Sequence, residues 1–116
     1  MDYTVIFYET EKSKIPVEEY ILSLSLKSQA KIYKSLELLE TYGVNIPYPY
    51  VSHIEDKLFE LRIKFSSNQY RILYFIDTGK EIILLHAFSK KTKAIRKTDI
   101  DLAKSRKKDY LERRKK

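Results

Sequence analysis

Three strand-like runs between Leu58 and Lys91 constrain the fold more than any other feature of the chain. The first run, FELRIKF, alternates apolar and charged residues, as a strand with one buried and one wet face does. The second, YRILYFI, and the third, IILLHAF, are almost wholly apolar, which indicates strands covered on both faces. Polar residues at 66–69 and a turn at 77–80 separate the runs. The pattern therefore predicts a three-stranded antiparallel meander.

The residues before the meander predict the remainder of an α+β fold. The run YTVIFY at 3–8 is β-branched and aromatic, which is typical of a strand. Pro16, followed by two glutamates, predicts a helix start. Ser25 and Gly43 are suitable caps for a second helix over 26–42. We expect a helical hairpin that covers one face of the sheet.

The expected buried side of the second helix follows a spacing of three or four residues. It comprises Leu26, Ala30, Tyr33, Leu36 and Leu39 or Leu38. Residues 44–57 contain two prolines and predict a loop that crosses from the helix to the sheet.

A C-terminal helix is predicted from Thr98, which could form a capping box with Asp101, to about Leu111. One side of it carries Ile100, Ala103, Lys107 and Tyr110 or Leu111. Charge is concentrated in this part of the chain. Residues 1–89 carry a net charge of −2 and residues 90–116 a net charge of +9. Such a segment is typical of proteins with a polyanionic partner, and equally of a solubilising tail.

Length and composition exclude several classes of protein. A chain of 116 residues predicts one domain over 1–116, and 43% hydrophobic residues exclude wholesale disorder. Without cysteine there is no disulfide framework or thiolate site, and two histidines are too few for a His-rich metal site. No secretory signal or run of about 20 apolar residues is present. We expect a cytoplasmic protein without cofactor, metal or membrane contact.

Strand pairing predicts where the basic residues of the meander lie. If Phe65 pairs with Tyr70, Lys64 lies opposite Arg71, and Arg62 shares their face because opposed residues point the same way.

Pairing Ile76 with Glu81 across the next turn brings His86 opposite Arg71 on the same face. Lys90 and Lys91 follow the end of that strand.

Opposed like charges destabilise a strand pair, so this arrangement favours an anion between them. Arginine binds phosphate through a fork of donors, and lysine adds a point charge. Such a cluster suits RNA cleavage, in which a 2′-hydroxyl attacks the adjacent phosphate and the enzyme orients groups and stabilises charge. His86 or a lysine of depressed pKa could accept the proton. The alternatives are that Glu60 neutralises Arg62, that Arg71 is an edge residue and that His86 is structural.

At these residues the chain resembles the RelE superfamily of toxins, in its phage-derived HigB-like branch. The matching motifs are LRIK at 61–64, YRILY at 70–74, LLHAFSKK at 84–91 and IDLA at 100–103. The resemblance covers about residues 58–111.

The resemblance implies a small α+β ribonuclease that cleaves mRNA on the ribosome without a metal and inhibits translation. It also implies a cognate antitoxin, usually a helix-turn-helix HigA-like protein. By position, Arg62 and Lys64 correspond to the first basic pair of the family's site, Arg71 to its phosphate-binding arginine, and Lys91, with Lys90 adjacent, to a second cation. The catalytic tyrosine of RelE has no aromatic counterpart at 94–97.

Two alternatives stay open at this point. One is a toxin of the same fold with another target such as gyrase, although those relatives lack the basic set. The other is a non-catalytic module that binds RNA or the ribosome through the basic tail.

Overall fold

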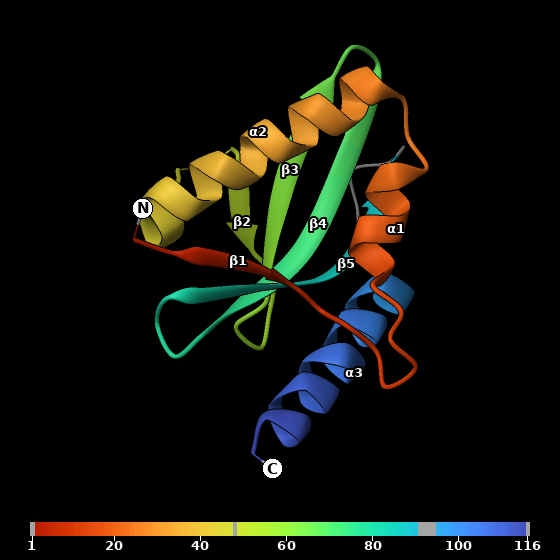
Figure 1. The fold of residues 1–116 in the computed structure, drawn as a ribbon. Coiled ribbons are helices and arrows are strands. Elements are labelled where there is room, and N and C mark those ends of the chain that lie inside the picture. The colour runs from red at the N-terminus through yellow and green to blue at the C-terminus, as the bar shows by residue number, and fades with distance from the viewer. Residues whose placement is uncertain (1, 48, 91–94, 116) are drawn as a thin grey trace.

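The computed structural model, which describes residues 2–47, 49–90 and 95–115, contains a five-stranded mixed sheet with helices on both faces (Figure 1). The strand order is β1-β5-β4-β3-β2, with β1 parallel to β5 and all other neighbours antiparallel. The predicted α+β fold is confirmed. Its elements are β1 (Thr4–Phe7), α1 (Pro16–Leu22), α2 (Leu26–Tyr42), the 3-10 helix η1 (Gly43–Asn45), β2 (Val51–His53), β3 (Phe59–Phe65), β4 (Asn68–Asp77), β5 (Glu81–Ser89) and α3 (Lys97–Arg114).

Helices α1 and α2 cover one face of the sheet, as predicted for the helical hairpin. Ser25 caps α2 by accepting the backbone N–H of Ser28 at 3.2 Å. The predicted buried side of α2 was wrong in part, because Leu26 is 82% exposed and Tyr33 is exposed. The side that faces the sheet is rotated, since the Ser28 hydroxyl bonds the Tyr70 hydroxyl at 2.8 Å. The buried residues of α2 are Ser28, Ile32, Leu36 and Leu39.

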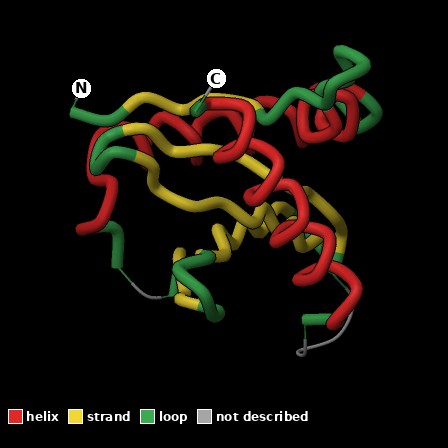
Figure 2. The backbone as a smooth tube through the Cα atoms, turned by 90° about the horizontal axis from the view of Figure 1, so that it is seen from below, coloured by secondary structure: helices red, strands yellow, loops and turns green. Residues whose placement is uncertain are grey.

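Helix α3 lies against the opposite face, where it contacts β5 and β4; Figure 2 shows it running obliquely beneath the strands. Ala103 is fully buried, with Ile100, Tyr110 and Leu111 packed beside it. The predicted capping box of Thr98 and Asp101 was wrong. The helix begins at Lys97 without a side-chain cap, and Asp101 instead pairs with Lys97 one turn away at 2.8 Å.

The predicted pairing of β3 with β4 was wrong by two residues. Ser66, with a φ of +58°, permits a tight turn, so β4 begins at Asn68 and Arg62 lies opposite Arg71. Lys64 lies opposite Gln69. A shift of two residues preserves the face of every side chain, because side chains alternate with a period of two. The predicted convergence of the basic residues on one face therefore holds.

The predicted pairing of β4 with β5 was also wrong, because the turn pairs Asp77 rather than Ile76 with Glu81 and because β5 contains a bulge. The register slips between Leu73 and Tyr74, so His86 lies opposite Leu73, and Arg71 lies opposite Phe88. A continuous run of apolar residues gives no sequence signal for an extra residue in the strand.

The predicted loop over 44–57 contains two short elements, η1 and β2. Strand β2 extends the sheet beyond β3 and pairs only with its first half, from Phe59 to Leu61. No helix in the described ranges is long and apolar enough to cross a membrane.

Candidate functional site

A buried carboxylate, Glu60, lies at the centre of three cationic side chains. Its Oε1 is 3.0 Å from Nε of Arg62, and its Oε2 is 3.5 Å from Nε of Arg71 and 3.9 Å from Nζ of Lys90. Glu60 is only 1% exposed. One negative charge therefore faces three positive charges. Glu60, Arg62, Arg71 and Lys90 are here called the Glu60 cluster, which has a surplus of two positive charges.

Strand geometry explains how the cluster forms. Alternation along β3 places Glu60, Arg62 and Lys64 on one face, and the register brings Arg71 opposite Arg62. Like charges at opposed positions of a strand pair repel. Glu60 offsets this repulsion, since it contacts both arginines. The Ser52 hydroxyl on β2 adds a further contact, because it accepts a hydrogen bond from Nη2 of Arg62 at 3.3 Å.

Arg71 is the most constrained arginine of the cluster. It is 9% exposed, and it donates to Oε1 of Gln69 at 3.1 Å and to the Tyr70 carbonyl at 3.3 Å. Burial lowers the pKa of Arg71, while the charge of Glu60 opposes that effect. Nε of Arg71 and Oε2 of Glu60 are both buried and form no hydrogen bond with any described residue. An arginine held this firmly presents its donors in a fixed geometry.

Lys90 closes the cluster from the end of β5. Its backbone N–H donates to the Gln69 carbonyl at 2.9 Å, and its side chain is 6% exposed. Burial lowers the pKa of Lys90; Glu60 opposes that effect, and Arg71 and Arg62 add to it. The predicted site residue Lys91 lies outside the described residues.

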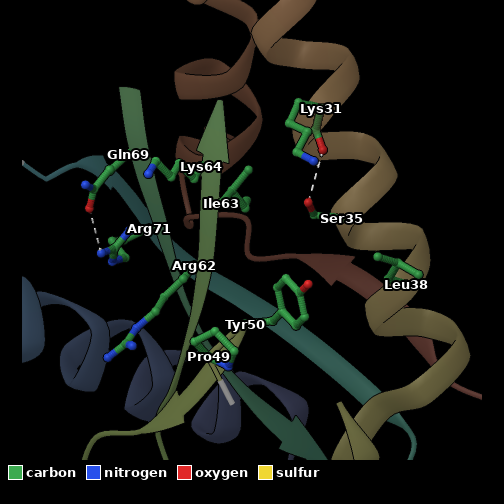
Figure 3. A pocket seen from close by; sticks show the side chains of 10 residues that line it. All are labelled: Lys31, Ser35, Leu38, Pro49, Tyr50, Arg62, Ile63, Lys64, Gln69 and Arg71. Atoms are coloured by element: carbon green, nitrogen blue, oxygen red, sulfur yellow. Dashed lines mark hydrogen bonds between the residues drawn. The ribbon is translucent and has the colours of Figure 1, made fainter. Parts of the chain in front are cut away.

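A cavity of about 360 Å³ opens where β3 extends beyond β2 (Figure 3). Arg62, Lys64 and Arg71 lie on one side of β3, with Gln69 beside them, and Tyr50 lies on the other side. Lys64 is exposed, so the structure places it at the rim rather than in the Glu60 cluster. The described lining includes four basic side chains and no acidic one. It comprises Lys31, Ser35, Leu38, Pro49, Tyr50, Arg62, Ile63, Lys64, Gln69 and Arg71.

His86 lies on the same sheet face but turns toward α3. Its Nε2 is 2.7 Å from Oδ1 of Asp99, and its ring stacks on Phe88. Oδ2 of Asp99 accepts Nε of Arg96 at 3.1 Å. Burial lowers the pKa of His86, and the hydrogen bond to Asp99 opposes that effect. The structure therefore brings Arg62, Arg71 and Lys90 together and gives His86 a contact with the helix.

The sequence interpretation identified Glu60 only as a neutralising partner of Arg62, and it missed Gln69 altogether. The signal for Glu60 was present, because it alternates with Arg62 and Lys64 in the same strand. No such signal marks Gln69, whose role depends on the tight turn at Ser66.

The arrangement can bind an anion of more than one charge. It offers two arginine forks and a buried lysine around a carboxylate that contacts all three. Among the described side chains, no group of three or more His, Cys, Asp or Glu residues could hold a metal ion.

Comparison with known proteins identifies a family. No curated protein matches the chain. Residues 19–108, which span α1 to α3 and include every described residue of the Glu60 cluster, match the family described as "Phage derived protein Gp49-like (DUF891)". This family belongs broadly to the HigB/RelE-like toxin group. The chain is thus a member of the phage-derived Gp49-like family.

Proposed function

We propose that this protein is the toxin of a type II toxin–antitoxin system and acts as a ribosome-dependent mRNA endonuclease. The observation that carries the proposal is the surplus of two positive charges in the Glu60 cluster, beside a cavity lined by basic side chains. Membership of the Gp49-like family supports it. mRNA in the ribosome supplies the polyanionic substrate, which places the protein in the cytoplasm. A helix-turn-helix antitoxin of the HigA kind is the proposed partner.

In the proposed reaction the ribose 2′-oxygen attacks the adjacent phosphorus and loses its proton. The bond from phosphorus to the 5′-oxygen breaks and this oxygen takes up a proton from water, which gives a 2′,3′-cyclic phosphate and a 5′-hydroxyl. Arg71 and Arg62 stabilise the charge that develops on the phosphate oxygens, and Lys64 orients the strand at the rim. Lys91 would add a second cation next to Lys90. These cations fill the role that metal ions have in many nucleases.

Two groups are candidates for the proton acceptor. Burial lowers the pKa of Lys90 and that of His86, which moves each toward the neutral form that accepts a proton. Lys90 lies within the Glu60 cluster, whereas His86 is bonded to Asp99. A pH–rate profile of each substituted protein distinguishes them, because loss of the true base removes the acidic limb of the profile.

The test is RNA-end mapping after tightly controlled induction of the wild type and of Arg71→Ala. We expect growth arrest with new RNA ends for the wild type. Arg71→Ala should lower the cleavage rate by roughly 10²–10³, as loss of one transition-state donor does.

The matched control is Arg114→Ala. Arg114 also pairs with a buried carboxylate, Asp77, at 2.8 Å on the same sheet face, but it belongs to α3. Arg114→Ala should keep both growth arrest and the new RNA ends. Normal growth with a folded wild-type protein would refute the proposal.

A non-catalytic RNA- or ribosome-binding module is the second candidate. The observation in its favour is that Arg71 and Lys90 are already buried against Glu60, as purely structural ion pairs are. It predicts growth arrest without new RNA ends, and binding that weakens steeply with salt. A toxin directed at gyrase would instead change DNA supercoiling.

A further inference from the structure

The outer edge of β3 is only half covered. Strand β2 pairs with β3 up to Leu61, and the last contact across this edge is the Arg62 N–H, which donates to the Tyr50 carbonyl at 2.7 Å. Backbone groups of alternate residues point to the same side of a strand, so Lys64 directs its N–H and C=O to this edge as well. No described strand pairs with Lys64 there.

A groove runs along this edge, and helix α2 forms its other wall. The cavity near Lys64 continues into a second one of about 270 Å³, and the two share Lys31, Ser35, Leu38, Tyr50 and Arg62. The second cavity is further lined by Tyr42, Ile46, Pro47 and Leu61. One wall is therefore a stripe of α2, and the other is the strand edge with the loop that precedes β2.

The two sides of the groove differ in chemistry. On the α2 side, Leu38 and Tyr42 are 47% and 51% exposed, and Tyr50 is 57% exposed, so this side presents apolar surface to water. On the opposite side of β3 lie Arg62, Lys64 and Arg71 (Figure 3). No acidic residue lines either cavity among the described residues.

We propose that this groove binds an extended polypeptide segment of a partner protein, which adds to β3 as a further strand in line with β2. Side chains of an added strand alternate between the two faces of the sheet. One set would meet Leu38, Tyr50 and Ile63, and the other would meet the cations. The segment therefore alternates apolar and acidic residues.

The free strand edge decides between a protein and an RNA occupant. RNA would use the cations, including Lys31 on α2, but it has no backbone that continues the hydrogen-bond ladder of β3 and would leave Leu38 and Tyr42 of α2 without an apolar partner. An added strand uses all three features. A partner strand in this position covers Arg62, Lys64 and Arg71, so under the proposed function it also silences cleavage.

The probe is a blocked eight-residue peptide in which aspartate alternates with valine, measured against the full chain by calorimetry and by hydrogen exchange at single amides. We expect binding that slows exchange of the Lys64 amide. A peptide in which lysine replaces aspartate should bind at least about tenfold more weakly, because its charge repels the groove. A peptide N-methylated at alternate positions should also lose binding, because it lacks the ladder donors.

Two variants locate the binding. Leu38→Glu places a negative charge in the groove wall and should weaken binding by roughly tenfold or more, whereas Leu26→Glu, on the same helix at an 82% exposed position, should not. Lys64→Pro removes the outward N–H but keeps the ladder with β4, and it should abolish binding beyond the effect of Lys64→Ala. Circular dichroism confirms that each variant folds.

Three outcomes would overturn the proposal. They are equal binding by the N-methylated peptide, equal binding by Leu38→Glu, and unchanged exchange of the Lys64 amide at saturating peptide. An eight-nucleotide RNA that binds the wild type, loses binding to Leu38→Glu and displaces the peptide would make the groove a nucleic-acid site. Because the assay contains no ribosome, its result stands whether or not the protein cleaves mRNA.

Discussion

Two buried carboxylates on the same face of the sheet, Glu60 and Asp77, differ in how many cations surround them. Asp77, at the end of β4, is 2.8 Å from Nε of Arg114, so one negative charge meets one positive charge. Glu60 meets three cations from β3, β4 and the end of β5. Buried ion pairs in this protein are therefore of two kinds, one with balanced charges and one with an excess of positive charge.

The difference follows from where α3 lies. Helix α3 covers the end of β4 that carries Asp77 and contributes Arg114 to it, so that pair joins helix to sheet. Asp99, at the start of α3, is similar, because it is shared between Arg96 and His86. The cations of the Glu60 cluster come from β3, β4 and the residue after β5, and the two arginines line an open cavity. The balanced pair joins helix to sheet, whereas the cluster with surplus charge is the one to which the proposed function assigns a ligand.

The sharpest test of this comparison is the same change at both carboxylates. Glu60→Gln leaves three cations without an anion, and we expect it to lower the free energy of unfolding by roughly 3 kcal/mol, in the range of a broken buried pair. Asp77→Asn should cost only about 1 kcal/mol, because Arg114 is 42% exposed and can turn to water.

Urea unfolding measures both costs, and cleavage assays on the folded proteins measure function. Glu60→Gln should slow cleavage because Arg62 and Arg71 lose their common partner, while Asp77→Asn should cleave normally. Equal losses of stability and activity in the two variants would show that Glu60 and Asp77 have the same role.

A smaller effect of opposite sign is expected for Lys90→Met. The change removes a buried cation from a cluster with surplus positive charge and keeps the volume of the side chain. We expect the free energy of unfolding to rise by about 1 kcal/mol, while cleavage slows by roughly 10². Lys104→Met, which removes a lysine paired with Glu55 outside the cluster, should leave stability unchanged within the error of the measurement. A destabilised Lys90→Met protein would show that the third cation belongs to a balanced pair.

The last expected effect concerns His86 and the dependence of stability on pH. Because burial lowers the pKa of His86 in the folded protein, the unfolded chain binds a proton first as the pH falls. Stability should therefore decline as the pH falls from about 6.5 through the lowered pKa, by at most about 1.4 kcal/mol per pH unit.

Thermal melts between pH 5 and 8 measure this slope, and His86→Gln should flatten it while keeping a donor for Asp99. The same slope in wild type and variant would assign the pH dependence to other groups.

Much of the fold could be predicted from the sequence, because period-two alternation and helix caps are local signals. Ser25 capped α2 as expected, and the face shared by Arg62, Lys64 and Arg71 survived a two-residue error in register. What could not be predicted depends on geometry between distant residues. The bulge in β5 and the rotation of α2 toward Tyr70 leave no trace in local patterns.

The candidate site was predicted in part for the same reason. Its basic residues could be recognised as charged residues in predicted strands. The contacts of Glu60 with three cations depend on how three strands pair, which local patterns do not specify. The contact of His86 with Asp99 depends on the docking of α3, which sequence periodicity does not specify.

The parallel pairing of β1 with β5 has a consequence for synthesis of the chain. The partners of Thr4 to Phe7 are Glu81 to Leu84, so the strand translated first must wait for the strand translated last before it can enter the sheet. Lys90 follows β5 directly and joins Glu60 only when β3 and β4 have paired. The cationic surface is therefore assembled late, only after β5 and Lys90 have left the ribosome.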